Sequence, residues 1–135
     1  MQQALDNLCG AGKPLNAEAP DANEIEGLLR TGRARLLDSH NTDLALESRF
    51  DLAYNAAHAL RPAALRRKGY RSSNRYIVFQ VLPHTLGLGP EAWRVLDKCH
   101  NTRNLGEYEG MLDVDERIVT DLISATEAVS NAIRK

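Results

Sequence analysis

The sequence has few of the residues that build disulfide frameworks, metal sites or membrane spans. Its two cysteines, Cys9 and Cys99, are far apart and lack CxxC spacing, which predicts neither a disulfide framework nor a zinc site. No apolar run approaches the roughly 20 residues that cross a bilayer. Residues 1–15 contain neither the basic segment nor the apolar run of an export signal. We therefore expect a cytoplasmic protein with no metal, no cofactor and no membrane contact.

Acidic residues are missing from one long segment. No Asp or Glu occurs between Asp51 and Glu91, whereas this segment carries six basic residues. A concentrated positive patch attracts anions, so a phosphate-binding surface is one interpretation. A solvated helix end and a docking surface for an acidic partner protein are the other two. The candidate nucleic-acid contacts in this basic run, which begins at Arg61, are Arg66, Arg67, Lys68, Arg71 and Arg75.

The hydrophobic pattern predicts one all-α domain of about five helices. A chain of 135 residues is long enough for a single core. Residues 1–20 read as a flexible leader and residues 21–135 as the helical domain. Apolar residues at helical spacing and the positions of proline predict the helices. The first helix is expected over 22–38. The second is expected to begin at caps offered by Asn41 and Thr42 and to reach Pro62, which kinks or ends it. The other three are expected over 75–86, 90–108 and 114–133.

Two of these helices differ in how clearly the sequence predicts them. Residues 75–86 are rich in β-branched side chains, but nothing else reads as a strand, so we interpret this segment as a buried helix. The last helix has the clearest pattern, with acidic residues at its positive N-terminal end. Its apolar face is predicted to contain Ile118, Leu122, Ala125, Thr126, Val129 and Ile133.

Five polar side chains that could take part in catalysis or binding fall within nine residues of the fourth predicted helix. At 100° per residue they share one sector of the helix, which continues the stripe formed by Trp93 and Leu96. Charged groups on a face that buries apolar residues are costly unless they are paired or functional. The five candidate site residues are His100, Arg103, Asn104, Glu107 and Tyr108.

The segment Arg103-Asn104-Leu105-Gly106-Glu107-Tyr108 on a small helical bundle resembles the HEPN superfamily. The signature of that superfamily is an Arg, often followed by Asn, and a His four to six positions later. The resemblance implies a two-fold homodimer whose motifs meet in a cleft, here with Trp93 and Leu96 at the interface. Many such domains are metal-independent ribonucleases of prokaryotic toxin–antitoxin or defence systems, and others bind RNA, nucleotides or partner proteins.

This sequence departs from the signature at Tyr108, which stands where the resemblance places the His. A tyrosine with an ordinary pKa near 10 is a poor general base at neutral pH. His100 lies one turn before Arg103 on the same face, so a rearranged His/Arg ribonuclease site is one hypothesis, in which Glu107 orients His100 or pairs with Arg103. The preferred hypothesis is a non-cleaving protein that binds RNA, a nucleotide or a partner protein.

The resemblance also suggests a partner enzyme. In related systems a nucleotidyltransferase modifies a tyrosine near the motif, so such an enzyme, or another protein of an antitoxin system, is an expected partner. Tyr108 is the candidate for this modification, because Arg103 is placed to pair with an added phosphate. The preferred interpretation is that Tyr108 hydrogen-bonds a neighbour across the dimer, and modification is the alternative.

Overall fold

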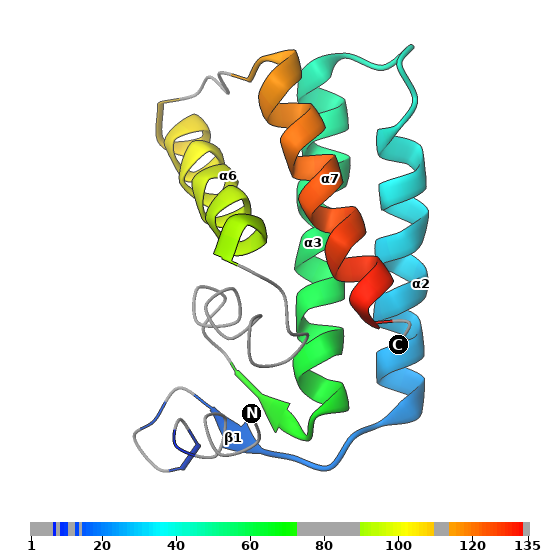
Figure 1. Ribbon diagram of the computed structural model, residues 1–135, viewed down its shortest axis with the longest axis vertical. Helices are drawn as coiled ribbons and strands as arrows, with labels where there is room; N and C mark the ends of the chain where they lie inside the picture. The colour runs from blue at the N-terminus through cyan, green and yellow to red at the C-terminus, as the bar shows by residue number, and fades with distance from the viewer. Residues whose placement is uncertain are drawn as a thin grey trace.

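The computed structural model describes residues 7, 9, 10, 13, 15–72, 90–109 and 114–133, of which 107–109 are described by their backbone alone. These residues are mostly helical, which confirms the predicted all-α class (Figure 1). The helix predicted at 75–86 lies outside them. The described elements are β1 Asn16–Ala17, α2 Ala22–Ser39, α3 Leu46–Arg67, β2 Tyr70–Arg71, α6 Pro90–Glu109 and α7 Glu116–Ile133.

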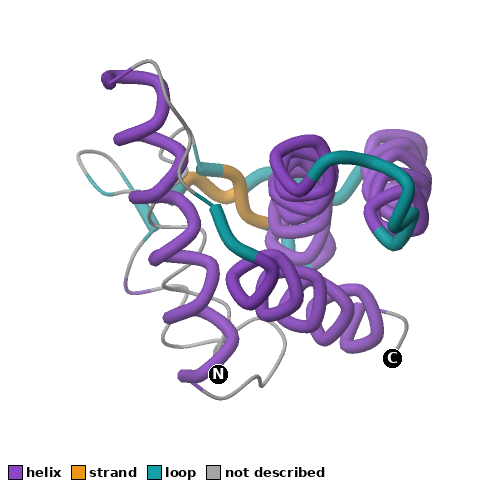
Figure 2. The backbone as a smooth tube through the Cα atoms, turned by 90° about the horizontal axis from the view of Figure 1, so that it is seen from above, coloured by secondary structure: helices purple, strands orange, loops and turns teal. Residues whose placement is uncertain are grey.

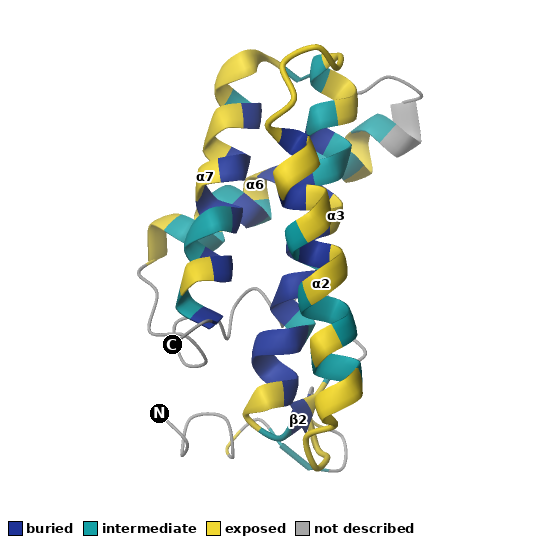
Figure 3. Cartoon of the chain, turned by 90° about the vertical axis from the view of Figure 1, so that its right-hand side faces the viewer, coloured by how far each residue is buried: buried dark blue, intermediate teal, exposed yellow. Residues whose placement is uncertain are grey.

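Helix α3 is the central element. Helix α2 runs antiparallel along one side of α3, and α6 lies on the other side (Figures 1 and 2). Helix α7 contacts α2, α3 and α6, so the core forms where these helices meet. Figure 3 shows the buried residues on the facing sides of the helices. The core includes Phe50, Leu60, Leu96, Leu122 and Ile133.

The predicted apolar face of the last helix is confirmed. Its members are buried, apart from Ile118, which packs partly buried against the core. The helix begins at Glu116, and Asp115 Oδ1 accepts a hydrogen bond from the Ile118 backbone N at 2.8 Å. This carboxylate satisfies one of the unpaired N–H groups of the first turn and faces the positive end of the helix.

Two predictions about α3 are corrected. Of the two alternatives at Pro62, a kink or an end, the end is wrong, because the helix continues to Arg67. Pro62 removes one backbone donor, yet the residues on both sides of it are buried, and their packing in the bundle offsets that loss. The N-cap position is Ala45, which has no side-chain oxygen, rather than Asn41 or Thr42. Asn41 Oδ1 instead accepts a hydrogen bond from the Asp43 backbone N within the turn.

The short strand pair was not predicted. β1 and β2 are antiparallel, with Asn16 opposite Arg71 and Ala17 opposite Tyr70. Two residues are too few to show the alternation by which strands are predicted. The turn before β2 requires Gly69, whose φ of 89° disfavours residues with a Cβ. The pair attaches residues 16–17 to the end of α3, within the segment expected to be a flexible leader.

Helix α2 is positioned by its cap and by a close approach to α3. Asp21 Oδ1 accepts hydrogen bonds from the first-turn backbone N atoms of Asn23 and Glu24. Near the middle of α2, Gly32 is buried against Leu60 of α3, and a Cβ there would lie 2.7 Å from Leu60 Cγ. Within the described part of the chain, none of the helices combines the length and the apolar character needed to cross a membrane.

Candidate functional site: a polar cluster between α3 and α6

His100 on α6 lies between two hydrogen-bond partners. Its Nδ1 is 2.8 Å from Tyr54 Oη on α3, and its Nε2 is 3.2 Å from Asn104 Nδ2, one turn further along α6. The Tyr54 and His100 rings lie 6.4 Å apart and are nearly parallel, at 18°. His100 and Asn104, which the sequence places on one face of the helix, are therefore close together in the structure.

The two partners of His100 decide which of its nitrogens carries the proton. A tyrosine hydroxyl can donate or accept, whereas an amide Nδ2 only donates. With Asn104 in the orientation described, His100 Nε2 accepts and Nδ1 donates to Tyr54 Oη in a neutral imidazole. Rotation of the Asn104 amide would reverse this order, because its Oδ1 would then accept from Nε2. In either orientation of the Asn104 amide, one nitrogen of the neutral His100 ring donates a hydrogen bond and the other accepts one.

Arg103 points from α6 to α3 and pairs with a carboxylate. Arg103 Nη1 donates to Asp51 Oδ1, and its Cζ lies 5.9 Å from the centre of the Tyr54 ring. The latter is a cation–π distance. The side chains of Arg103 and Asp51 are 29% and 44% exposed, so the pair lies at the surface, within reach of a ligand. A phosphate that approaches Arg103 must compete with Asp51.

The network continues along α3 into the interior. Tyr54 meets the ring of His58 edge to face, with the ring centres 4.3 Å apart. His58 Nδ1 is 2.7 Å from Arg61 Nη2. An arginine has no acceptor, so His58 Nδ1 accepts and the proton of the neutral ring is on Nε2. We call the set formed by Asp51, Tyr54, His58, Arg61, His100, Arg103 and Asn104 the α3–α6 polar cluster.

The other residues predicted for this site have different outcomes. Leu96 is 1% exposed and belongs to the core of the single chain, and Trp93 packs partly buried against the same core. Leu96 is therefore not available for the predicted dimer interface, which stays a prediction that rests on Trp93. Glu107 and Tyr108 belong to α6, but their side chains lie outside the described residues, so their predicted roles stay predictions.

The basic run is divided between two structural settings. Arg66 is 3% exposed and bonds Glu24 Oε1 at 2.6 Å and Glu18 Oε2 at 3.1 Å. It also donates to the backbone carbonyls of Glu18 and Ala19. Arg71 bonds the same two carboxylates, at 2.6 and 2.7 Å. Two of the five candidate nucleic-acid contacts thus attach the segment before α2 to the end of α3.

This ion-pair network is electrically balanced, since two arginines meet two glutamates. The hydrogen bonds from Arg66 and then Arg71 lower the pKa of Glu24 below its ordinary value. Those from Glu24 and then Glu18 raise the pKa of Arg71. Both shifts favour the charged forms of Glu24 and Arg71, which stabilises the network.

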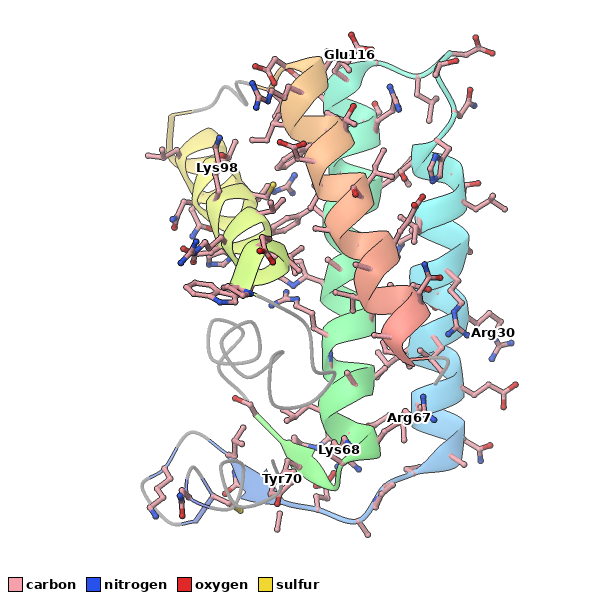
Figure 4. The ribbon with its side chains drawn as sticks, in the orientation of Figure 1. Arg30, Arg67, Lys68, Tyr70, Lys98 and Glu116 are labelled. Atoms are coloured by element: carbon pink, nitrogen blue, oxygen red, sulfur yellow. The ribbon has the colours of Figure 1, made fainter. Side chains whose placement is uncertain are left out.

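The remaining basic candidates are more accessible. Arg67 and Lys68 are exposed at the end of α3 (Figure 4), where Arg67 also donates to the carbonyl of Ile133 at the C-terminal end of α7. This cation is favourably placed at the negative end of that helix. Arg75 lies outside the described residues. The nucleic-acid role of the basic run stays a prediction.

Cysteine and metal chemistry have little support in the described part of the chain. Cys99 is fully buried on α6, and burial raises the pKa of its thiol to about 12. It therefore stays protonated and is a poor nucleophile at neutral pH. Across 15–72, 90–106 and 114–133, no three His, Cys, Asp or Glu side chains gather so that they could hold a metal ion.

The sequence indicated the α6 half of the cluster but missed its α3 half. The α6 residues follow from spacing within one helix, whereas Asp51 and Tyr54 are some fifty positions away from their partners. In the sequence Tyr54 falls among the apolar residues of α3, and nothing near it indicates that its hydroxyl has a histidine partner. The chain matches no protein-family model, no curated protein and no solved structure.

Proposed function

We propose that this chain is an HEPN-like protein of a prokaryotic toxin–antitoxin or defence system, which binds single-stranded RNA at the α3–α6 polar cluster without cleaving it. The supporting observation is the position of Arg103. Its guanidinium is partly exposed, beside the Tyr54 ring and the His100 imidazole. Arginine donors bind phosphate oxygens, and the exposed Asn104 amide can contact bases or sugars. The buried Tyr54 ring instead supports Arg103 and His100 from the core.

Binding rather than cleavage is favoured by the contacts of the two groups that a ribonuclease would need. The charge of Arg103 is offset by Asp51, which leaves less positive charge to stabilise a phosphate as negative charge builds up in a transition state. Both nitrogens of His100 already have neighbours. The homodimer, with a cleft between two such clusters, is part of the same proposal and rests on the family resemblance.

The alternative function is a metal-independent endoribonuclease with His100 and Arg103 as its catalytic pair. The observation that favours it is the contact of Tyr54 Oη with His100 Nδ1. A hydrogen bond on one imidazole nitrogen fixes the ring and the tautomer, and so directs the other nitrogen toward a substrate hydroxyl. Asn104, which is exposed, would have to move aside for a 2′-hydroxyl to reach Nε2.

Fluorescence anisotropy with labelled single-stranded RNA tests the binding proposal. Arg103→Ala should weaken binding about tenfold or more, because hydrogen bonds to charged groups are strong. Asp51→Asn should strengthen binding by up to about fivefold, because it removes a competing carboxylate from an exposed pair. The matched control is Lys98→Ala, on the same helix but at the α6–α7 side, which should change affinity little.

Two results would contradict the proposal. If wild-type protein does not bind RNA at low salt, the binding proposal is wrong. If Arg103→Ala and Lys98→Ala lose RNA affinity equally, the losses reflect a general effect of charge and not a site at Arg103. The two functions are separated by incubating the RNA with EDTA present. Cleavage that is lost in both His100→Ala and Arg103→Ala would establish the ribonuclease in place of the non-cleaving protein.

A further inference from the structure

The side of α2 that faces α3 forms a second polar hollow, separate from Arg103 and His100. This α2–α3 groove has a volume of about 500 Å³, within the range of small-ligand sites. The α2 residues that matter here are Gly27, Leu28, Thr31 and Arg35, and those of α3 are Asn55 and Ala59. Figures 1 and 2 place α3 between α2 and α6, so the groove lies on the flank of α3 opposite α6. His58 of α3, a member of the α3–α6 polar cluster, also lines the groove, so the two sites share this residue.

One end of the groove carries a concentration of hydrogen-bond donors. Thr31 and Arg35 lie one turn apart on the same side of α2, and Asn55 lines the groove from α3. All three are exposed. Together they offer a guanidinium, an amide and a hydroxyl to one ligand group, which suits a phosphate with its several terminal oxygens better than a carboxylate with two.

The groove carries an uncompensated positive charge. Arg35 has no hydrogen-bond or ion-pair partner among the described residues. Glu24 is the acidic residue that lines the groove, and both of its carboxylate oxygens are taken by Arg66 and Arg71. An anion that enters the groove therefore meets a guanidinium that pairs with no carboxylate among the described residues, unlike that of Arg103, which pairs with Asp51.

The other end of the groove offers open space between polar and apolar side chains, and its polar lining is formed by Asn23, Glu24 and His58. Gly27 lies two turns before Arg35, about 12 Å along the helix. No atom comes within 4 Å of a Cβ built at Gly27, so the groove is open there. Leu28 and Ala59 line the groove beside it. A ligand anchored at Arg35 can extend a carbon skeleton over this part.

We propose that the α2–α3 groove binds an organic phosphomonoester. Its phosphate lies at Arg35, Thr31 and Asn55, and its organic part extends toward Gly27. Two sources share this chemistry, a sugar phosphate and a nucleoside monophosphate, and the hydrogen-bonding groups along the groove suit the hydroxyls of either one. The site shares His58 with the polar cluster but uses none of Arg103, His100 and Asn104, so it does not depend on whether these residues bind RNA.

Isothermal titration calorimetry on the full chain tests this site with ribose 5-phosphate, adenosine 5′-monophosphate and inorganic phosphate. At least one ester should bind, about tenfold or more tightly than inorganic phosphate, because only the esters have an organic part that reaches Leu28 and Ala59. Tighter binding of the ribose ester would identify a sugar phosphate, and tighter binding of the adenosine ester a nucleotide. If neither ester binds, or if inorganic phosphate binds equally well, the proposal is wrong.

Two substitutions and one matched control locate the site. Arg35→Gln should weaken ester binding about tenfold or more. Gly27→Leu should weaken it as much by filling the open end, while the fold is kept, because leucine favours a helix and its Cβ meets no atom. The control is Arg30→Gln, on the same helix, where the side chain points away from α3 (Figure 4) and affinity should not change.

The comparison among these variants decides the outcome. Thermal unfolding of each variant shows whether its fold is intact. Equal affinities of the Arg35→Gln and Arg30→Gln proteins would overturn the site, as would unchanged binding by a folded Gly27→Leu protein. Loss of ester binding in Arg35→Gln and Gly27→Leu with unchanged RNA binding would support the groove and show that it acts independently of the polar cluster.

Discussion

The two glycines of α2 should respond in opposite ways to the same substitution. A Cβ at Gly32 would lie 2.7 and 2.8 Å from two carbons of the buried Leu60 side chain and 3.2 Å from the Ala56 carbonyl oxygen. A Cβ at Gly27 meets nothing within 4 Å. Gly32→Ala therefore forces α2 away from α3 or Leu60 out of its position, whereas Gly27→Ala adds a methyl group in open space.

The expected magnitudes follow from two opposing effects. Overpacking of a close contact costs about 1–3 kcal/mol, whereas replacing a glycine inside a helix by alanine gains about 0.5–1 kcal/mol. Gly32→Ala should therefore lower the free energy of unfolding by about 1–2 kcal/mol, and Gly27→Ala should raise it by up to about 1 kcal/mol. For a chain of this length each 1 kcal/mol corresponds to about 3–4 °C in Tm.

Urea denaturation followed by far-UV circular dichroism measures both variants against the wild type. A shift in midpoint at constant m-value shows that stability, rather than the compactness of the unfolded chain, has changed. The reasoning is refuted if Gly32→Ala is as stable as Gly27→Ala, because the close approach of α2 to α3 would then not constrain the bundle. A destabilised Gly27→Ala protein would refute the open space at the groove.

The remaining predictions concern two titratable groups. Burial raises the pKa of Cys99 to about 12, so a thiol reagent at neutral pH should label it only when the protein unfolds. The partly exposed Cys9 is the internal comparison, and equal labelling rates in the folded protein would contradict the burial. The pKa of Glu24 is lowered, above all by its hydrogen bond with Arg66, so its contribution to stability is present above about pH 4.5 and is lost as the pH falls through the lowered pKa. Glu24→Gln should flatten the acid limb of the stability–pH curve, and an unchanged limb would show that another group causes it.

Several corrections have one physical origin. A helix end at Pro62, predicted as the alternative to a kink, follows from a local rule about one missing hydrogen bond, whereas α3 is held by the buried residues on both sides of that proline. Caps at Asn41 and Thr42 were also a local inference, and the helix begins a full turn later, at Leu46. Helix propensity is worth up to about 1 kcal/mol for most residues and about 3 kcal/mol for proline, and packing against neighbouring helices overrides it here.

The candidate site divides in the same way. His100, Arg103 and Asn104 share a helix face because of their spacing, and this needs no tertiary structure to predict. The sequence could not show that Asp51 offsets the charge of Arg103 or that Tyr54 holds His100, because these partners are remote in the chain. It also could not show that Arg66, a member of a conspicuous basic run, is buried among carbonyls and carboxylates of the segment before α2.

The sequence by itself determined the all-α class and the apolar face of the last helix. Both depend on periodicity within one segment, which 3.6 residues per turn converts directly into a face. Only the tertiary structure decided that α3 lies between α2 and α6, and therefore which polar groups meet on its two flanks. Contacts between helices depend on how the segments dock, and the charge available at Arg103 or Arg35 depends on whether a remote carboxylate reaches it.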